Sequence, residues 1–207
     1  MYDINTKLNI KCPVCGSSAE LFQHTYYICP KCNWDSLVNT VDIAYGDPAS
    51  SVLSNLFPHK FLFYTKTRPG IFDDTHCLSM ESFLQSLRVK EASFQKYICE
   101  NYSGPMVQKL KVCLRDWRED GYLYWNGIAI NRDSLTYHEL ITTAYDCLFE
   151  SNPIFRECVL PKFKGVHLIH SIGKDYESET LLTESEFRYQ LNRLIQRLDY
   201  NQSQSSE

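Results

Sequence analysis

Two closely spaced pairs of cysteines near the start of the chain constrain its fold more than any other feature. The pairs are Cys12 with Cys15 and Cys29 with Cys32, and two short alternating, strand-like runs lie between them. Four thiolates satisfy the tetrahedral preference of Zn²⁺, and the two-residue gap within each pair lets the backbone turn both sulfurs towards one ion. The spacing therefore predicts a small β zinc ribbon that holds one structural zinc ion through these four cysteines.

Other chemistry for the four cysteines is less compatible with the residues around them. An iron–sulfur cluster and two redox dithiols are the rival interpretations, but Gly16 and Asn33 directly after the pairs suit a closed structural site. A closed site has no open coordination position, so this zinc would stabilise and present the ribbon rather than act as a catalytic Lewis acid.

The ribbon also carries aromatic and basic side chains, namely Tyr26, Tyr27, Trp34, Lys11 and Lys31. They could stack on bases and contact phosphates, as in single-strand binders. Alternatively, they form a docking surface or the small core that such a module needs. The formal net charge of −4 provides no global basic field, so any contact with nucleic acid would have to be local.

The rest of the chain has the composition of an ordinary folded domain. Its 207 residues are 43% hydrophobic, which is enough for one core and a satellite module and too apolar for a disordered protein. The composition changes along the chain and divides it into four parts: a ribbon (1–36), a linker (37–51), a main domain (52–198) and a polar tail (199–207).

The sequence predicts neither a membrane span nor an export signal. A span needs about 18 consecutive apolar residues, and the first residues lack the basic and apolar blocks of a signal peptide. The five remaining cysteines are scattered without pair spacing, as is typical of a reducing compartment. We therefore expect a cytoplasmic protein without a membrane partner, and the oligomeric state stays open.

Apolar periodicity predicts a mainly helical α+β main domain with short strands. The dipeptide Asn126-Gly127 between two apolar runs predicts a hairpin, because both positions tolerate positive φ. Residues 166–170 resemble a buried strand. Helices are expected over 80–87, 92–102, 104–117, 134–151, 153–159 and 183–198.

One predicted helix carries an unusual polar stripe. Glu81, Gln85 and Arg88 are spaced so that they share one face beside an apolar one, and Ser79 is placed to cap the helix. The spacing alone favours a solvated surface stripe over a functional one.

Several motifs in the main domain resemble, in order, those of the NADAR family, which is named for NAD and ADP-ribose. Its members include N-glycosidases of riboflavin-pathway intermediates and hydrolases that remove ADP-ribose from guanine. The resembling segments are Ser54–Pro58, the Ser79, Glu81, Gln85 and Arg88 set, Trp117, Asn152–Leu160 and Val166–Ser171. The resemblance implies a NADAR-like helical fold with N-glycosidase chemistry.

The resemblance also implies roles for individual residues. Glu81 would be the catalytic carboxylate, Asn55 and Gln85 would bind ribose hydroxyls or the base, Arg88 would pair with a phosphate, and Trp117 would stack on an aromatic ring. Arg156 would be a second phosphate contact or a structural partner of a helix end.

Two further candidates lie near the second strand signal. Lys174 follows a small Ser-Ile-Gly turn and could bring an ammonium group to an anion. His170 could transfer protons or bind the substrate, although a histidine at the end of an apolar strand also fits a core position.

The sequence thus predicts an enzyme that hydrolyses an N-ribosyl bond in an ADP-ribosylated nucleobase or a ribosylated-base metabolite. The ribbon would stabilise the protein or recruit the substrate. Two alternatives stay open: an ADP-ribose or nucleotide-binding protein without catalysis, and a zinc-ribbon accessory factor that binds nucleic acid.

Overall fold

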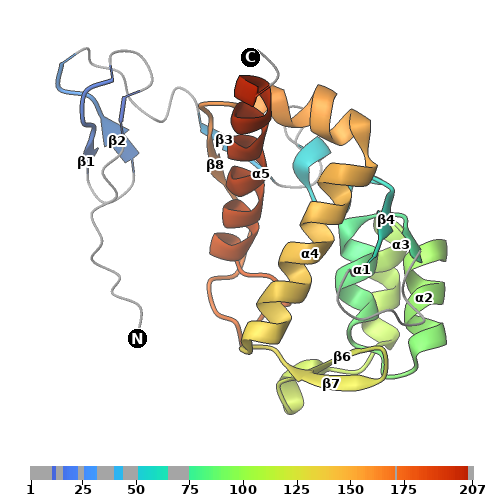
Figure 1. Ribbon diagram of the computed structural model, residues 1–207. Coiled ribbons are helices and arrows are strands. Elements are labelled where there is room, and N and C mark those ends of the chain that lie inside the picture. The colour runs from blue at the N-terminus through green and yellow to red at the C-terminus, as the bar shows by residue number, and fades with distance from the viewer. Residues whose placement is uncertain are drawn as a thin grey trace.

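In the computed structural model, the described residues form an α+β arrangement in which helices dominate and the strands are short (Figure 1). None of the helices in the described residues is both long and apolar enough to cross a membrane. The structure describes residues 11–12, 16–22, 26–31, 40–43, 51–64, 75–170 and 172–204.

Each predicted helix has a helical counterpart, but the third is much shorter than expected. Figure 1 shows α1, α2 and α3 grouped together, whereas α4 and α5 contact each other elsewhere in the molecule. The helices are α1 (Met80–Ser86), α2 (Ala92–Asn101), α3 (Pro105–Leu110), α4 (Leu135–Ser151) and α5 (Glu184–Gln204). Shorter helical turns are Ser51–Leu53, Lys111–Cys113, Trp117–Glu119, a π-helical turn at Ile154–Val159, and Leu160–Phe163.

The described strands pair in twos. The first pair is the predicted antiparallel β1 (Glu20–Phe22) with β2 (Tyr26–Ile28). Two antiparallel pairs follow in the main domain, and one pair is parallel. These are β4 (Phe61–Phe63) with β5 (Thr75–Cys77), β6 (Tyr122–Trp125) with β7 (Ile128–Asn131), and β3 (Thr40–Asp42) with β8 (His167–Ile169).

Helix α1 begins where the sequence predicts and lies entirely inside the protein. The Ser79 hydroxyl accepts from the backbone N–H of Ser82 at 3.1 Å, and the Ser82 hydroxyl accepts from the N–H of Ser79 at 3.1 Å. This reciprocal pair satisfies two donors at the helix start. All seven residues of α1 are buried, including Glu81. The polar stripe is therefore not a solvated surface.

The predicted hairpin is confirmed between β6 and β7. Trp125 pairs with Ile128, and the two turn residues Asn126 and Gly127 have φ values of 51° and 79°. Both lie in the left-handed region that this turn requires.

The third predicted helix is wrong in its length and its buried face. Instead of continuing to residue 117, α3 ends at Leu110, and Val107 is buried while Met106 is 56% exposed. The carbonyls of Lys111, Leu114 and Arg115 accept hydrogen bonds from the Arg88 guanidinium. In a regular helix these carbonyls would accept from backbone N–H groups, whereas here they accept from Arg88. This difference explains why α3 ends early.

The predicted linker and tail both contain regular structure. Residues 40–42 of the 37–51 linker form β3, which pairs in parallel with β8, and Ile43 donates its N–H to the Ile169 carbonyl at 2.8 Å. The segment expected as a polar tail from residue 199 begins inside α5, which continues to Gln204. Their polar composition led to the prediction that both segments are irregular. Residues 40–42 are nevertheless ordered by pairing with β8, and residues 199–204 continue helix α5.

A buried histidine makes the stability of the domain dependent on pH. The His59 ring packs between Phe57 and Phe155, and its Nε2–H donates to the Val52 carbonyl at 2.6 Å. Burial lowers the pKa of His59 below its ordinary value of 6.5. The unfolded chain therefore binds a proton at a pH at which the folded chain does not, and stability falls as the pH drops below about 6.5.

We expect His59→Gln to weaken this pH dependence. The urea midpoint of the wild type should decrease when the pH is lowered from about 7.5 to about 5. The decrease should be smaller in the variant. His76→Gln is the matched control, because His76 is exposed on β5. Equal pH dependence in the wild type and His59→Gln would contradict this assignment.

Candidate functional site

A polar cavity of about 570 Å³ opens on the main domain. Its walls come from segments far apart in sequence: the 54–56 loop, α1 with Arg88, residues 108–118, and parts of 170–187. The structure brings to this cavity seven of the eight residues predicted to catalyse or bind, namely Asn55, Glu81, Gln85, Arg88, Trp117, His170 and Lys174.

The carboxylate of Glu81 is the most enclosed acid in the cavity wall, and the residue is 9% exposed. Its Oε1 accepts a hydrogen bond from Nε2 of Gln85 at 3.0 Å and lies 3.3 Å from Nζ of Lys111. The backbone N–H of Glu81 donates to the Asn55 carbonyl at 2.8 Å. One buried carboxylate oxygen is therefore held by two donors, one of them a cation.

The side chain of Asn55 is fixed from outside the cavity wall. Its Oδ1 accepts the Tyr145 hydroxyl at 2.6 Å, and Tyr145 is buried on α4. Burial raises the pKa of this tyrosine well above its ordinary range, so its hydroxyl stays a donor. Asn55 is thus joined to α1 through its backbone and to α4 through its side chain.

Protein groups occupy most of the Arg88 guanidinium, which was predicted to bind a phosphate. Its N–H groups reach the carbonyls of Arg115 at 2.8 Å, Leu114 at 3.0 Å and Lys111 at 3.1 Å. A fourth bond, from Nη1 at 2.9 Å, goes to Oε1 of Gln85. This last bond fixes the Gln85 amide so that its NH₂ faces Glu81. Burial lowers the pKa of Arg88. Its role here is to hold the 111–115 segment and to orient Gln85.

The segment that Arg88 fixes brings Trp117 and two charged residues to the cavity. Trp117 is 5% exposed, so its ring is largely in the core and only part of it lines the wall. Next to it, the Arg118 guanidinium pairs with both carboxylate oxygens of Asp116, at 2.7 and 2.5 Å. These hydrogen bonds lower the pKa of Asp116 to about 2.

His170 and Lys174 form another part of the wall, after β8. The His170 ring packs edge-on against Phe187, its Nδ1 has no hydrogen-bond partner within the part of the chain that the structure describes, and burial lowers its pKa. A Cβ on Gly173 would lie 2.9 Å from the His170 ring, so this turn requires glycine to keep the ring in place. Lys174 is exposed at the rim.

Arg156 lies away from the cavity. Its Nη1 donates to the carbonyls of Phe149 and Glu150 in the last turn of α4, at 3.1 and 3.0 Å. Unpaired carbonyls at a helix C-terminus favour a cation, which explains this position. These contacts agree with the predicted role as a structural partner of a helix end, and they do not bring Arg156 to the cavity in which a phosphate contact was expected.

Three charged residues at or behind the cavity were not singled out from the sequence. Lys111 and Arg118 lie in its wall, on short turns with no periodic pattern that could have indicated them. Arg132, only 1% exposed, lies behind the wall and supports it. Its Nε donates to the Thr180 carbonyl at 3.1 Å, and its two terminal nitrogens bind Glu186 at 3.1 and 2.6 Å.

The cysteine pairs of the predicted ribbon are described only in part. Cys12 and Cys29 are buried, and the Gly16 N–H donates to the Cys12 carbonyl at 2.9 Å, as in a tight turn. Buried cysteine sulfurs beside such a turn fit a soft divalent ion. Cys15 and Cys32 lie outside the described residues.

Comparisons with known proteins assign the main domain to a phage family. Residues 48–196 match the family model of bacteriophage protein GP30.3. The chain is also 34% identical over 127 residues to an uncharacterized 17.1 kDa protein in the Gp30-rIII intergenic region of enterobacteria phage T4, covering 61% of this chain and 82% of that protein. No solved structure matches the chain.

These matches overturn the resemblance to the NADAR family. The family shown is a different one, and it spans the same segment in which the resembling motifs lie. Each of these motifs is only a few residues long, so their shared order does not by itself identify a family. The match begins at residue 48, so the two cysteine pairs lie outside it.

Proposed function

We propose that the polar cavity of this chain, which belongs to the bacteriophage protein GP30.3 family, hydrolyses an N-ribosyl bond. The matched region, residues 48–196, contains all the residues that line this cavity. The proposal rests on the chemistry of the cavity.

The observation that carries the proposal is a buried carboxylate in a cavity of ligand size. Glu81 is 9% exposed and lines a cavity of about 570 Å³. Small-molecule sites have volumes of about 300–1,000 Å³ and a few convergent polar groups. A charge enclosed in this way acts strongly on a ligand, because little water screens it.

A buried carboxylate in a cavity wall can stabilise a transition state in which the substrate becomes positively charged. When the bond between C1′ of ribose and the base nitrogen breaks, the base takes the electron pair and later a proton, and the sugar becomes oxocarbenium-like. Glu81 stabilises that charge and accepts a proton from the attacking water, whose oxygen bonds to C1′. In this proposal, Gln85 and Asn55, which line the same cavity, bind ribose hydroxyls.

Cations in the cavity wall favour a substrate that also carries an anionic group. Lys111, Arg118 and Lys174 all line the cavity, and each is at least partly exposed. They replace Arg88 as phosphate contacts in this proposal, because their charged ends are more accessible. A phosphate that attracted Lys111 would also release the Glu81 carboxylate from its ion pair.

A second candidate function is ligand binding without chemistry. The observation that favours it is the Lys111–Glu81 ion pair at 3.3 Å, which neutralises the proposed catalytic charge. If substrate leaves this pair intact, the cavity binds a nucleotide or ADP-ribose but does not stabilise an oxocarbenium ion.

A direct assay separates the two candidates. Purified protein is incubated with nucleoside monophosphates, ribosylaminopyrimidine phosphates, NAD and an ADP-ribosylated oligonucleotide, and released base is measured by mass spectrometry. Release of free base from at least one compound supports the hydrolase. Binding in calorimetry without any release supports the binding protein, and the absence of both rejects the cavity as a ribosyl site.

We also propose that the N-terminal segment is a zinc ribbon that holds one structural Zn²⁺ through Cys12, Cys15, Cys29 and Cys32. When bound, the ion supplies folding energy to a segment too small for a full core. Cys77, Cys99, Cys113 and Cys158 are free thiols, which fits the cytoplasmic location that we propose.

The zinc proposal predicts that Cys12→Ser removes the tightly bound metal. After gel filtration, we expect about one zinc per wild-type chain and almost none in the variant by elemental analysis. The thermal transition of the main domain should change little, because the matched family region starts at residue 48. Cys113→Ser is the control, because Cys113 is exposed in another part of the chain. Equal zinc content in wild type and Cys12→Ser would reject the ribbon.

A further inference from the structure

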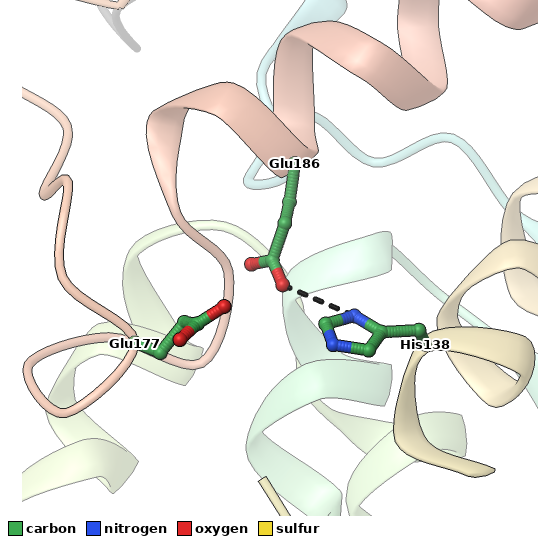
Figure 2. Close-up of side chains that lie close together, drawn as sticks. All are labelled: His138, Glu177 and Glu186. Atoms are coloured by element: carbon green, nitrogen blue, oxygen red, sulfur yellow. Dashed lines mark ion pairs between the residues drawn. The ribbon is translucent and has the colours of Figure 1, made fainter. Parts of the chain in front are cut away.

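A second group of possible metal ligands lies outside the cavity. His138 of α4, Glu177 of the 172–183 loop and Glu186 of α5 each offer one ligand atom, and these atoms all lie within 4.8 Å of one another. Figure 2 shows the three side chains converging from three separate elements. We propose that this group binds a divalent transition-metal ion such as Mn²⁺ through one imidazole and two carboxylates.

Glu186 is already held in the orientation that a metal ligand needs. Its Oε2 accepts bonds from the Thr183 N–H at 2.7 Å and from Nη2 of Arg132 at 2.6 Å. Its Oε1 is bound by Nη1 of Arg132 at 3.1 Å and faces Nδ1 of His138 at 3.2 Å (Figure 2). Carboxylates that ligate metals are commonly fixed by such hydrogen bonds. An ion would take the lone pair of Oε1 that now faces His138.

Charge and access at the group also favour a cation. Glu177 and Glu186 contribute two negative charges, whereas Arg132 contributes one positive charge, so a negative charge is left over when the imidazole is neutral. The side chain of His138 is 40% exposed and Glu177 is exposed, which gives an ion a path from solvent. Mixed imidazole and carboxylate ligands with water in the open positions suit borderline and hard divalent ions, whereas Mn²⁺ has little preference for the thiolates of the ribbon.

An ion at this place would connect the cavity wall to the helices behind it. Glu177 belongs to the loop that lines the cavity through residues on both sides of it, Lys174 and Glu179. Binding of Glu177 together with His138 and Glu186 would restrain this loop against α4 and α5. The metal would therefore stabilise the shape of the cavity without contacting a ligand in it.

The test is a titration of the full-length, zinc-loaded protein with Mn²⁺, in which electron paramagnetic resonance measures the free ion. We expect saturable binding of one Mn²⁺ per chain, weakened at least about tenfold by His138→Ala and by Glu177→Gln. His76→Ala and Glu119→Gln are the controls, since both residues are exposed and lie outside the group. The control variants should bind as the wild type does.

The outcomes do not depend on any catalytic activity, because no substrate is present. Absence of saturable binding in the wild type overturns the site. Unchanged binding in both His138→Ala and Glu177→Gln overturns it as well, because the ion would then be held elsewhere. Both replaced side chains are accessible to solvent, and the thermal transition of each variant verifies that it is folded.

Discussion

Replacing Glu81 with glutamine is expected to lower kcat by about 10²–10⁴-fold on the substrate that the assay identifies. Glutamine keeps the size of the side chain and its place beside Gln85, but it has no negative charge to stabilise the oxocarbenium ion and cannot accept a proton from water. The affinity for the substrate should stay within about tenfold of the wild type, because the other polar groups of the cavity are unchanged. Steady-state kinetics and calorimetry measure the two effects separately.

Glu119→Gln is the matched control for this experiment. Glu119 is exposed on the turn that follows Trp117 and does not line the cavity. The control should have wild-type kinetics. Turnover of Glu81→Gln at the wild-type rate, in a variant with an unchanged thermal transition, would remove Glu81 from the mechanism and leave the binding function as the better account of the cavity.

Replacing Arg132 with leucine is expected to destabilise the domain by about 3–5 kcal/mol, the range measured when one partner of a buried ion pair is removed. The Arg132 side chain is 1% exposed, and it binds both carboxylate oxygens of Glu186, the Thr180 carbonyl and the face of the Tyr137 ring. The variant leaves the Glu186 charge and a buried carbonyl without this partner. Urea denaturation gives the free energy of unfolding.

An exposed arginine–carboxylate ion pair provides a comparison that shows how much burial adds to the free energy of unfolding. Arg118 binds both oxygens of Asp116, but its side chain is 56% exposed, so Arg118→Leu should change the free energy of unfolding far less than Arg132→Leu does. Similar losses in the two variants would show that Arg132 contributes no more than a surface ion pair. Arg132→Leu should also make the backbone at Thr180 and Leu181 less rigid. Because both residues line the cavity, the affinity for a ligand should decrease.

Part of the candidate site could be predicted because its residues lie on one helix. Glu81 and Gln85 are one turn apart, so any helix there places them together, and the structure links them by a 3.0 Å hydrogen bond. Lys111 could not be predicted, since its contact with Glu81 joins residues 30 positions apart in sequence. The carbonyl partners of Arg88 could not be predicted for the same reason, because folding brings the 111–115 segment to its guanidinium.

The sequence by itself determined the local features of this protein. The cap at Ser79, the hairpin turn at Asn126-Gly127, the existence of the long helices and the spacing of the cysteine pairs depend on residues within a few positions of one another. Such features follow from backbone sterics, hydrogen bonds to neighbouring groups and the period of the helix.

Only the tertiary structure decided which face of α1 is enclosed, which charges meet there, and that residue 41 in the expected linker pairs with residue 168. These contacts join segments whose order in the chain carries no signal of their distance in space. Their stability comes from the burial of apolar side chains in a shared core, and that burial then fixes the positions of the polar groups around the cavity.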